Sequence, residues 1–189
     1  MERTIDNKKS IFTTKELTFT ALMAVLIIVC SWISIPTTVP FTLQTFAIFF
    51  SLVLLGGKCS TFSVLTFLLL GAVGLPVFSG FNGGVGALFG LTGGYMLGFL
   101  FTTTIFWASE LVFKNGWKRI IRSIFSMLIG LAVCYLFGTF WFMHVYALDN
   151  NVISFSGALM VCVIPYLGFD LLKMAVAVIL GERLRKLFF

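Results

Sequence analysis

Long apolar runs, interrupted only by glycine, proline or short charged stretches, fill most of this chain of 189 residues. Hydrophobic residues make up 59% of it and charged residues 11%, whereas about a quarter of a typical soluble domain is charged. The 23 phenylalanines exceed what one water-soluble core of this size can bury. Lipid must therefore surround much of the surface. The composition predicts an integral membrane protein with no room for a soluble catalytic domain.

Six apolar segments are separated by glycine, proline or charge, and a helix needs about 20 apolar residues to cross a bilayer. We therefore predict an all-α fold with six transmembrane helices. The second and third are short and are expected to form a tight hairpin. The predicted spans are residues 16–34, 41–56, 61–75, 92–113, 120–142 and 167–184.

The distribution of basic residues predicts the orientation of these helices. Twelve of the 13 lysines and arginines fall in the N-terminal arm, the second and fourth connections and the C-terminal tail. Those segments share one side of a six-span protein, and basic residues mark the cytoplasmic side. Both termini are therefore expected in the cytoplasm, in a multi-pass protein of the cell membrane. The net charge of +6 is then a topology signal and does not indicate nucleic-acid binding.

The glycine-rich outer connection is the most unusual part of the sequence. Ten of the 18 glycines lie between Gly71 and Gly98, and glycine lets chain segments turn tightly and approach each other or a ligand closely. We expect this connection to fold over the outer mouth of the helices. The expected organisation is a single membrane domain, residues 1–189, with a cytoplasmic arm (1–15), a glycine-rich outer loop (75–91) and an outer segment (152–166).

Asp170 and Lys173 are the charged residues placed well within a predicted span, three residues apart on one helical face. One interpretation is a structural ion pair that fixes the last helix against a neighbour. The other is a polar ligand site, because charged residues within a span are costly and mark substrate or ion pathways. We expect Pro165 and Gly168 to interrupt any continuous helix that enters the last span. If the last helix begins near Gly168, both residues lie in its first two turns from the outside, which favours the ligand site.

Three further residues are candidates for the same site, each with a structural alternative. Gln44 follows Pro40 at the outer start of the second span, and it could instead cap that helix or join two helices. Asn82 could be a turn residue, which asparagine favours. Tyr95 could belong to the belt of aromatic residues at the membrane surface, or its ring could pack on a flat substrate.

Motifs for nucleotide binding and hydrolysis are absent from the sequence. It contains no GxxxxGK(S/T) loop for ATP phosphates, no HExxH and no GxSxG. We expect no enzymatic activity, and no cofactor or metal bound to this chain. Energy for active transport would then come from another subunit or from an ion gradient.

Four stretches together resemble the BioY family, the biotin-specific S components of energy-coupling-factor transporters. They are VPFTLQTF (39–46), LLLGAVGLPVFSGFNGGVG (68–86), LTGGYMLGF (91–99) and VIPYLGFDLLK (163–173). The resemblance implies a six-helix S-component fold that holds biotin, the transported substrate, near the extracellular side. It also implies two kinds of partner, a transmembrane T subunit and two cytoplasmic ATPases, so that only partner subunits use ATP.

The resemblance assigns roles to individual residues. The implied substrate-binding set is Gln44, Asn82, Gly83, Gly84, Tyr95, Asp170 and Lys173. Two positions depart from the family's pattern. Leu91 stands where the family usually has proline. S components also tend to carry Ala-x-x-x-Ala on the first helix for docking to partner subunits, and here only Thr20 and Ala24 have that spacing, with Ala21 between them.

Two other functions are compatible with the residues alone. A stand-alone carrier or channel would move biotin or another small vitamin without ATP, and a small intramembrane enzyme would use Asp170. Two arrangements of the ligand also stay open. Asp170 and Lys173 could both contact the ureido ring of biotin, or Lys173 could pair with the carboxylate tail.

Overall fold

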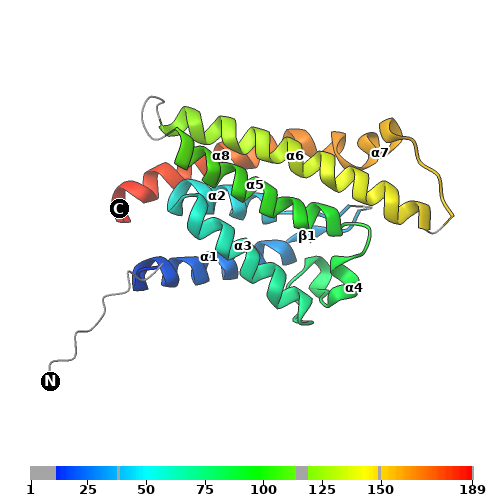
Figure 1. The fold of residues 1–189 in the computed structure, drawn as a ribbon, viewed down its shortest axis with the longest axis horizontal. Helices are drawn as coiled ribbons and strands as arrows, with labels where there is room; N and C mark the ends of the chain where they lie inside the picture. Colours follow the sequence, from blue (N-terminus) through cyan, green and yellow to red (C-terminus); the bar gives the residue numbers. More distant parts are fainter. Residues whose placement is uncertain (1–11, 38, 114–118, 149, 189) are drawn as a thin grey trace, which may run out of the picture.

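The computed structural model describes residues 12–37, 39–113, 119–148 and 150–188. Most of the predicted cytoplasmic arm (1–15) lies outside these residues. The described helices lie side by side along one axis of the molecule (Figure 1). Four of them are long and apolar enough to cross a membrane: α1 (Thr14–Trp32), α5 (Gly93–Val112), α6 (Arg119–Leu148) and α8 (Ile164–Phe188). Two shorter apolar helices, α2 (Gln44–Leu55) and α3 (Gly57–Ala72), pack among them.

Helices occupy all six segments where spans were predicted. The mostly helical fold is therefore confirmed, but the six-span count stays a prediction. With 12 and 16 residues, α2 and α3 are shorter than a simple crossing requires. The core is centred on α2, where Ile48, Phe49 and Leu52 are almost fully buried. The outward faces of the long helices expose large apolar side chains such as Ile129 and Leu172, which suits a surface covered by lipid.

The first helix begins at a capping box. The Thr13 hydroxyl accepts a hydrogen bond from the Glu16 N–H (3.2 Å), and the Glu16 carboxylate accepts one from the Thr13 N–H (2.8 Å). These bonds satisfy N–H groups that have no partner within the helix. The helix therefore begins at Thr14, two residues before the predicted start, because polar capping residues lie outside the apolar run.

Two glycines form the predicted tight hairpin between α2 and α3. Gly56 has a φ of +86°, a conformation that glycine adopts without a steric cost. At Gly57 a side chain is excluded, because a Cβ there would lie 2.4 Å from the Cα of Trp107 on α5. The hairpin can therefore turn within two residues and dock closely against α5.

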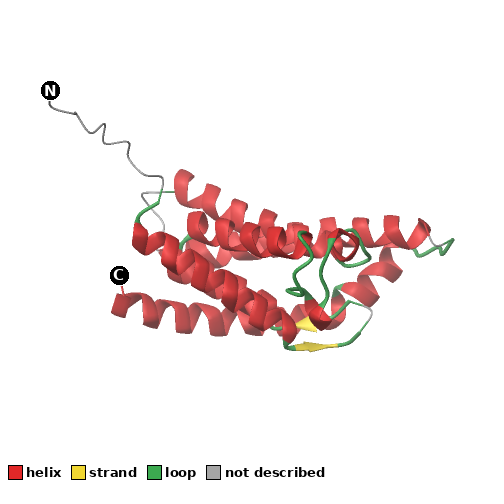
Figure 2. Cartoon of the chain, turned by 90° about the horizontal axis from the view of Figure 1, so that it is seen from below, coloured by secondary structure: helices red, strands yellow, loops and turns green. Residues whose placement is uncertain are grey.

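Short elements gather at the other end of the bundle. A two-stranded antiparallel hairpin, β1 (Ser34–Ile35) with β2 (Phe41–Thr42), connects α1 to α2, and the all-α prediction did not include it. The glycine-rich loop contains the 3-10 turn η1 (Ser79–Phe81) and α4 (Val85–Leu88), and it folds back against α1 and α3. The short helix α7 (Phe155–Cys162) packs on α6 and α8. Figure 2 shows the hairpin and these loops together at this end.

The last helix begins at Ile164, earlier than the predicted start near Gly168. Pro165 was expected to interrupt the helix, but it lies in the first turn, where a helix needs no N–H donor. The break falls at Val163 (φ −125°, ψ −54°), between α7 and α8. Asp170 therefore lies at the end of the second turn and Lys173 in the third, one turn deeper than expected.

Ion pairs join helix ends at the opposite end of the bundle. Among the described residues they are Lys58–Glu16 (3.6 Å), Arg119–Glu182 (3.5 Å) and Arg122–Glu110 (3.8 Å). The first joins the starts of α1 and α3, and the other two join the start of α6 to the ends of α8 and α5. Figure 1 shows the C-terminus at the same end. Apart from Lys173, the basic residues in the described part of the chain thus gather toward this end, as the topology prediction requires. Which side of the membrane this ion-pair end faces stays a prediction.

Candidate functional site

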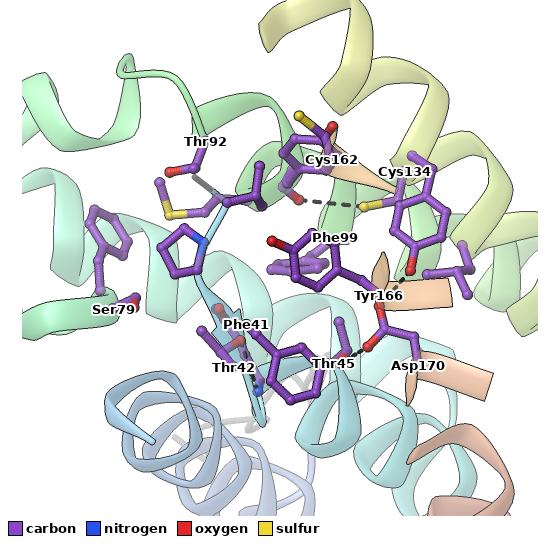
Figure 3. Close-up of a pocket in the computed structure, with 18 of the residues that line it drawn as sticks. Phe41, Thr42, Thr45, Ser79, Thr92, Phe99, Cys134, Cys162, Tyr166 and Asp170 are labelled. Carbon is purple, nitrogen blue, oxygen red and sulfur yellow. Dashed lines mark hydrogen bonds between the residues drawn. The ribbon is translucent and has the colours of Figure 1, made fainter. Parts of the chain in front are cut away.

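A cavity of about 250 Å³ lies at the end of the bundle opposite the ion pairs (Figure 3). Its walls come from the starts of α2 and α5, the middle of α6, the strand β2, the glycine-rich loop and α8. The volume is just below the range of about 300–1,000 Å³ that is typical of small-molecule sites. The polar residues that line it are Thr42, Gln44, Thr45, Ser79, Asn82, Thr92, Tyr95, Tyr135, Tyr166, Asp170 and Lys173.

Five predicted site residues line this one cavity: Gln44, Asn82, Tyr95, Asp170 and Lys173. They belong to α2, the glycine-rich loop, α5 and α8, so the fold brings together segments that are far apart in the sequence. Their contact with a ligand stays a prediction, but their convergence on one concave surface is a structural observation.

Asp170 is almost fully buried, and both of its carboxylate oxygens accept hydrogen bonds from the protein. Oδ1 accepts from the Thr45 hydroxyl (2.9 Å) and from the Lys173 ammonium group (2.8 Å). Oδ2 accepts from the Tyr135 hydroxyl (2.6 Å). An ionised carboxylate offers about four acceptor positions. One position therefore remains for a ligand, on the Oδ2 side.

Lys173 directs its ammonium group at protein acceptors. Nζ donates to Asp170 Oδ1 (2.8 Å), to the Thr42 carbonyl (2.7 Å) and to the Thr45 hydroxyl (3.2 Å). It also lies 4.0 Å from the centre of the Phe41 ring, in a cation–π contact. An ammonium group has three N–H donors, so all three have protein partners. Lys173 thus neutralises Asp170 and holds β2 against α8, which agrees with the structural interpretation of this side chain.

Gln44 carries an unsatisfied donor in the cavity wall. The residue is only 5% exposed, and Nε2 has no hydrogen-bond partner among the described residues. Leaving a buried amide donor unpaired costs about 1–3 kcal/mol. Because Gln44 lines the cavity, a rotation of its side chain toward the cavity would let a ligand carbonyl accept from Nε2 and recover this cost.

Tyr95 and Asn82 combine structural contacts with a place in the cavity wall. The Tyr95 hydroxyl lies 3.1 Å from the Thr139 hydroxyl of α6, and the residue is buried. It is therefore not part of an exposed aromatic belt. Asn82 Nδ2 donates to the Ser79 carbonyl (3.0 Å), so this residue also stabilises a turn, as its structural alternative proposed.

Gly83 and Gly84 are not among the residues that line the cavity. A Cβ at Gly83 would lie 2.2 Å from the carbonyl oxygen of Leu75, so this position allows two parts of the loop to approach closely. The Gly84 N–H donates to the Gly71 carbonyl (2.7 Å) at the end of α3. Both glycines shape the loop that carries Asn82. Their predicted contact with substrate stays a prediction.

Sequence reasoning missed Thr45, Tyr135 and Phe41, which surround the ion pair. Hydroxyl and aromatic residues are frequent in membrane helices, so their residue types gave no signal. A usable signal did exist. A buried carboxylate needs more donors than one lysine supplies, which should direct a search toward hydroxyl groups on neighbouring helices.

The lining residues determine what the cavity can bind. Asp170 and Lys173 are its charged members, and they neutralise each other, so the described lining carries no net charge. It offers an unused acceptor position at Asp170, an unpaired donor at Gln44 and apolar walls that include Phe99. This combination suits a compact neutral group that has both an N–H and a carbonyl, attached to an apolar body.

Two of the three predicted docking residues are buried in the interior of the protein. Thr20 and Ala24 are buried, and the Ser63 hydroxyl of α3 donates to the Thr20 carbonyl (2.9 Å). Of the three residues, Ala21 is exposed. The spacing of Thr20 and Ala24 therefore serves the packing of α1 on α3, because small residues let helices approach closely. Leu91, the departure from the family pattern, packs beside Tyr95 ahead of α5.

Comparisons with known proteins extend over almost the whole chain. The model of the BioY family matches residues 4–189. A relative from Thermotoga maritima named biotin transporter BioY is 38% identical over 175 residues, covering 92% of this chain and 97% of the relative. A probable biotin transporter BioY from Pyrococcus horikoshii is 36% identical over 172 residues, covering 90% and 96%. A crystal structure of the S-component for biotin from an ECF-type ABC transporter superposes with a TM-score of 0.78 at 30% identity, covering 93% of this chain and 95% of that one.

Proposed function

The chain belongs to the BioY family, and from this premise we propose that it is the biotin-binding S component of an energy-coupling-factor transporter. It captures biotin from outside the cell and delivers it in complex with a transmembrane T subunit and two cytoplasmic ATPases. The chain itself catalyses no reaction and binds no nucleotide. The relatives' names and the S-component structure support this proposal, and the cavity supplies the physical argument.

The unpaired Gln44 donor beside the neutral Asp170–Lys173 pair is the observation that carries the proposal. The ureido ring of biotin has two N–H donors and one carbonyl acceptor. Asp170 Oδ2 can accept from a ureido N–H, and Gln44 Nε2 can donate to the ureido carbonyl. The apolar remainder of the bicyclic ring system then lies against walls such as Phe99 and Met96.

This assignment favours one of the two ligand arrangements. Lys173 has protein acceptors for all three of its N–H groups, so pairing with the tail carboxylate would break at least one of them. We propose that Lys173 contributes by neutralising and orienting Asp170 beside the ureido ring, and that the tail lies toward the cavity mouth. Gln44 Nε2 is the group that donates a hydrogen bond to the ureido carbonyl.

The topology belongs to the same proposal. We propose six spans with both termini in the cytoplasm, so that the ion-pair end faces the inside of the cell and the cavity faces the outside. From Arg183, near the basic end of α8, Asp170 is about 20 Å distant along the helix at about 1.5 Å per residue. The cavity therefore lies within the outer half of the bilayer.

Titration calorimetry with biotin tests the proposal on the purified full chain. We expect saturable binding of one biotin without ATP or partner subunits, and no ATPase activity. An analogue whose ureido carbonyl and N–H groups are removed should bind far more weakly. Absence of biotin binding by a folded chain would overturn the assignment.

Vesicles that contain this chain alone separate the S component from a stand-alone carrier. We expect them to bind biotin without accumulating it. Accumulation against a gradient by these vesicles would contradict the requirement for T subunit and ATPases, while leaving biotin as the ligand.

A further inference from the structure

The segment 73–91, which is the glycine-rich loop with the two residues before it, exposes large apolar side chains at the cavity end of the molecule. Val73, Phe81, Val85 and Phe89 are 85%, 62%, 56% and 56% exposed, respectively. None of the four is a lining residue of the cavity. The sequence from Cys59 to Ser109 contains no charged residue, so the loop has none. A loop in water usually carries the opposite composition.

The helices that carry this loop are too short to raise it above the bilayer. The Gly57 N–H donates to Glu110 (2.7 Å), so the start of α3 and the end of α5 lie at the same level. At about 1.5 Å per residue, Ala72 lies about 21 Å from Lys58 along α3, and Gly93 about 26 Å from Glu110 along α5. The hydrocarbon layer is about 30 Å thick. With the ion pairs at one boundary, both ends of the loop fall inside that layer.

The neighbouring connection at the same end behaves differently. Leu148, at the end of α6, lies about 39 Å from Arg122 along that helix, which exceeds the hydrocarbon thickness. Figures 1 and 2 both show the end of α6 extending farther along the long axis than the end of α3 and the glycine-rich loop. The cavity end is therefore uneven, with one side projecting and the other side short.

Polar groups of the loop backbone find partners within the protein. The indole N–H of Trp32 donates to the Pro76 carbonyl (2.9 Å), and that of Trp141 donates to the Gly90 carbonyl (3.1 Å). Irregular backbone at membrane depth is tolerated only where protein buries it or where it lines a cavity. Two tryptophans on different helices thus supply hydrogen bonds that lipid cannot.

We propose that residues 73–91 form a membrane-embedded loop whose outward face is covered by acyl chains of the leaflet at the cavity end. We define this outward face as Val73, Phe81, Val85 and Phe89. It continues the exposed apolar surface of α3, where Leu69 is 57% exposed. The partner is therefore lipid hydrocarbon, and the cavity is roofed on this side by protein within the bilayer. The inference does not depend on which ligand the cavity binds.

Three exposed valines, one of them a control, allow a direct test. Single cysteines replace Val73, Val85 or Val152 in the full chain, with Val152 as the control because it is 97% exposed in the connection after α6. The four native cysteines are buried, and the stoichiometry of labelling checks that they stay unmodified. Each purified variant receives a nitroxide spin label and is placed in lipid nanodiscs. Collision with oxygen and with a water-soluble nickel chelate is then measured by power saturation.

We expect the labels at positions 73 and 85 to collide mainly with oxygen, which concentrates in hydrocarbon, and the label at 152 to collide mainly with the nickel chelate. Nickel accessibility at 73 and 85 equal to that at 152 would place the loop in water and overturn the proposal. Low accessibility to both reagents would also overturn it, because a second protein copy would then cover the face. Biotin is absent from all samples, so failure of the proposed function would not alter the result.

Discussion

The two ends of the bundle use the same charged residue types in different surroundings. At the ion-pair end, the paired side chains are 14–36% exposed and join the ends of different helices. At the cavity end, Asp170 and Lys173 are 6% and 10% exposed, and both hydrogen-bond to the Thr45 hydroxyl. Partly exposed pairs contribute about 1 kcal/mol or less, whereas breaking a buried pair costs about 3–5 kcal/mol. Stability and ligand binding should therefore respond differently to changes at the two ends.

Lys173→Met should produce the largest effect of any single change. It leaves Asp170 buried without its cation, which should lower the free energy of unfolding by about 3–5 kcal/mol. It should also weaken biotin binding by about 30-fold or more, since Asp170 and β2 lose their common partner. Thermal unfolding in detergent and titration calorimetry measure the two quantities.

The double variant Asp170→Asn with Lys173→Met is the control for this change. It removes both charges, so stability should recover relative to Lys173→Met while binding stays weak. Affinity equal to that of the unchanged chain in both variants would show that the pair is purely structural and would remove the contrast between the two ends.

The sequence predicted the positions of the helices better than their ends. Apolar runs identified all six helical segments, because hydropathy reflects which surface meets lipid. The start of α1 depends on the hydrogen bonds of Thr13, which carries no hydropathy signal. The start of α8 was placed too late because Pro165 was interpreted as a break, although proline suits the first turn of a helix.

The sequence singled out cavity-lining residues where their types are rare in membrane spans, while their contact with a ligand stays a prediction. Asp170 and Lys173 are costly there, so their presence alone indicated a site. Thr45 and Tyr135 could not be identified, because their role arises from contacts with Asp170, which lies 125 and 35 positions away in sequence, respectively. The motif spacing on α1 was misleading for a similar reason. Which side of a helix meets a neighbour depends on packing that the spacing does not specify.

Tyr135→Phe should weaken biotin binding by about 10-fold, because it removes a hydrogen bond to a carboxylate, worth about 1.5–3 kcal/mol. The lost bond is the 2.6 Å contact with Asp170 Oδ2, the oxygen proposed to face the ligand. Calorimetry should show this loss with the fold intact. Tyr146→Phe is the matched control, since it removes a tyrosine hydroxyl from the same helix at a position that does not line the cavity. Equal effects of both changes would contradict a specific role for Tyr135.

Gln44→Met should change stability and affinity in opposite directions. It replaces an unpaired buried amide with an apolar side chain of similar size, so the ligand-free chain should gain about 1 kcal/mol. Biotin affinity should fall about 5- to 10-fold, because the N–H group that donates to the ureido carbonyl is lost. Thermal unfolding with and without biotin separates the two effects. A loss of stability without ligand would show that Gln44 has a structural partner and is not reserved for substrate.

Glu110→Gln tests the ion-pair end by itself. The Glu110 carboxylate accepts from the Gly57 N–H and lies 3.8 Å from Arg122. Neutralising this partly exposed group should cost about 1 kcal/mol of stability. Biotin affinity should stay within about 2-fold of the unchanged chain, because the change is at the far end of the bundle. An affinity loss like that of Lys173→Met would mean that the two ends act as one coupled unit.

Replacing the carboxylate of biotin with a primary amide should produce the smallest effect. The three N–H groups of Lys173 already have protein acceptors, and its charge is balanced by Asp170. No other charged residue lines the described cavity, so the tail carboxylate meets no unbalanced cation there. We therefore expect the amide to bind within about 3-fold of biotin, which is less than 1 kcal/mol. Lys173→Met should then weaken both ligands by the same factor, because it acts through Asp170 on the ureido ring that they share. If Lys173→Met lowers the affinity for biotin far more than the affinity for the amide, Lys173 contacts the tail. The positions of ring and tail in the cavity would then have to be reversed.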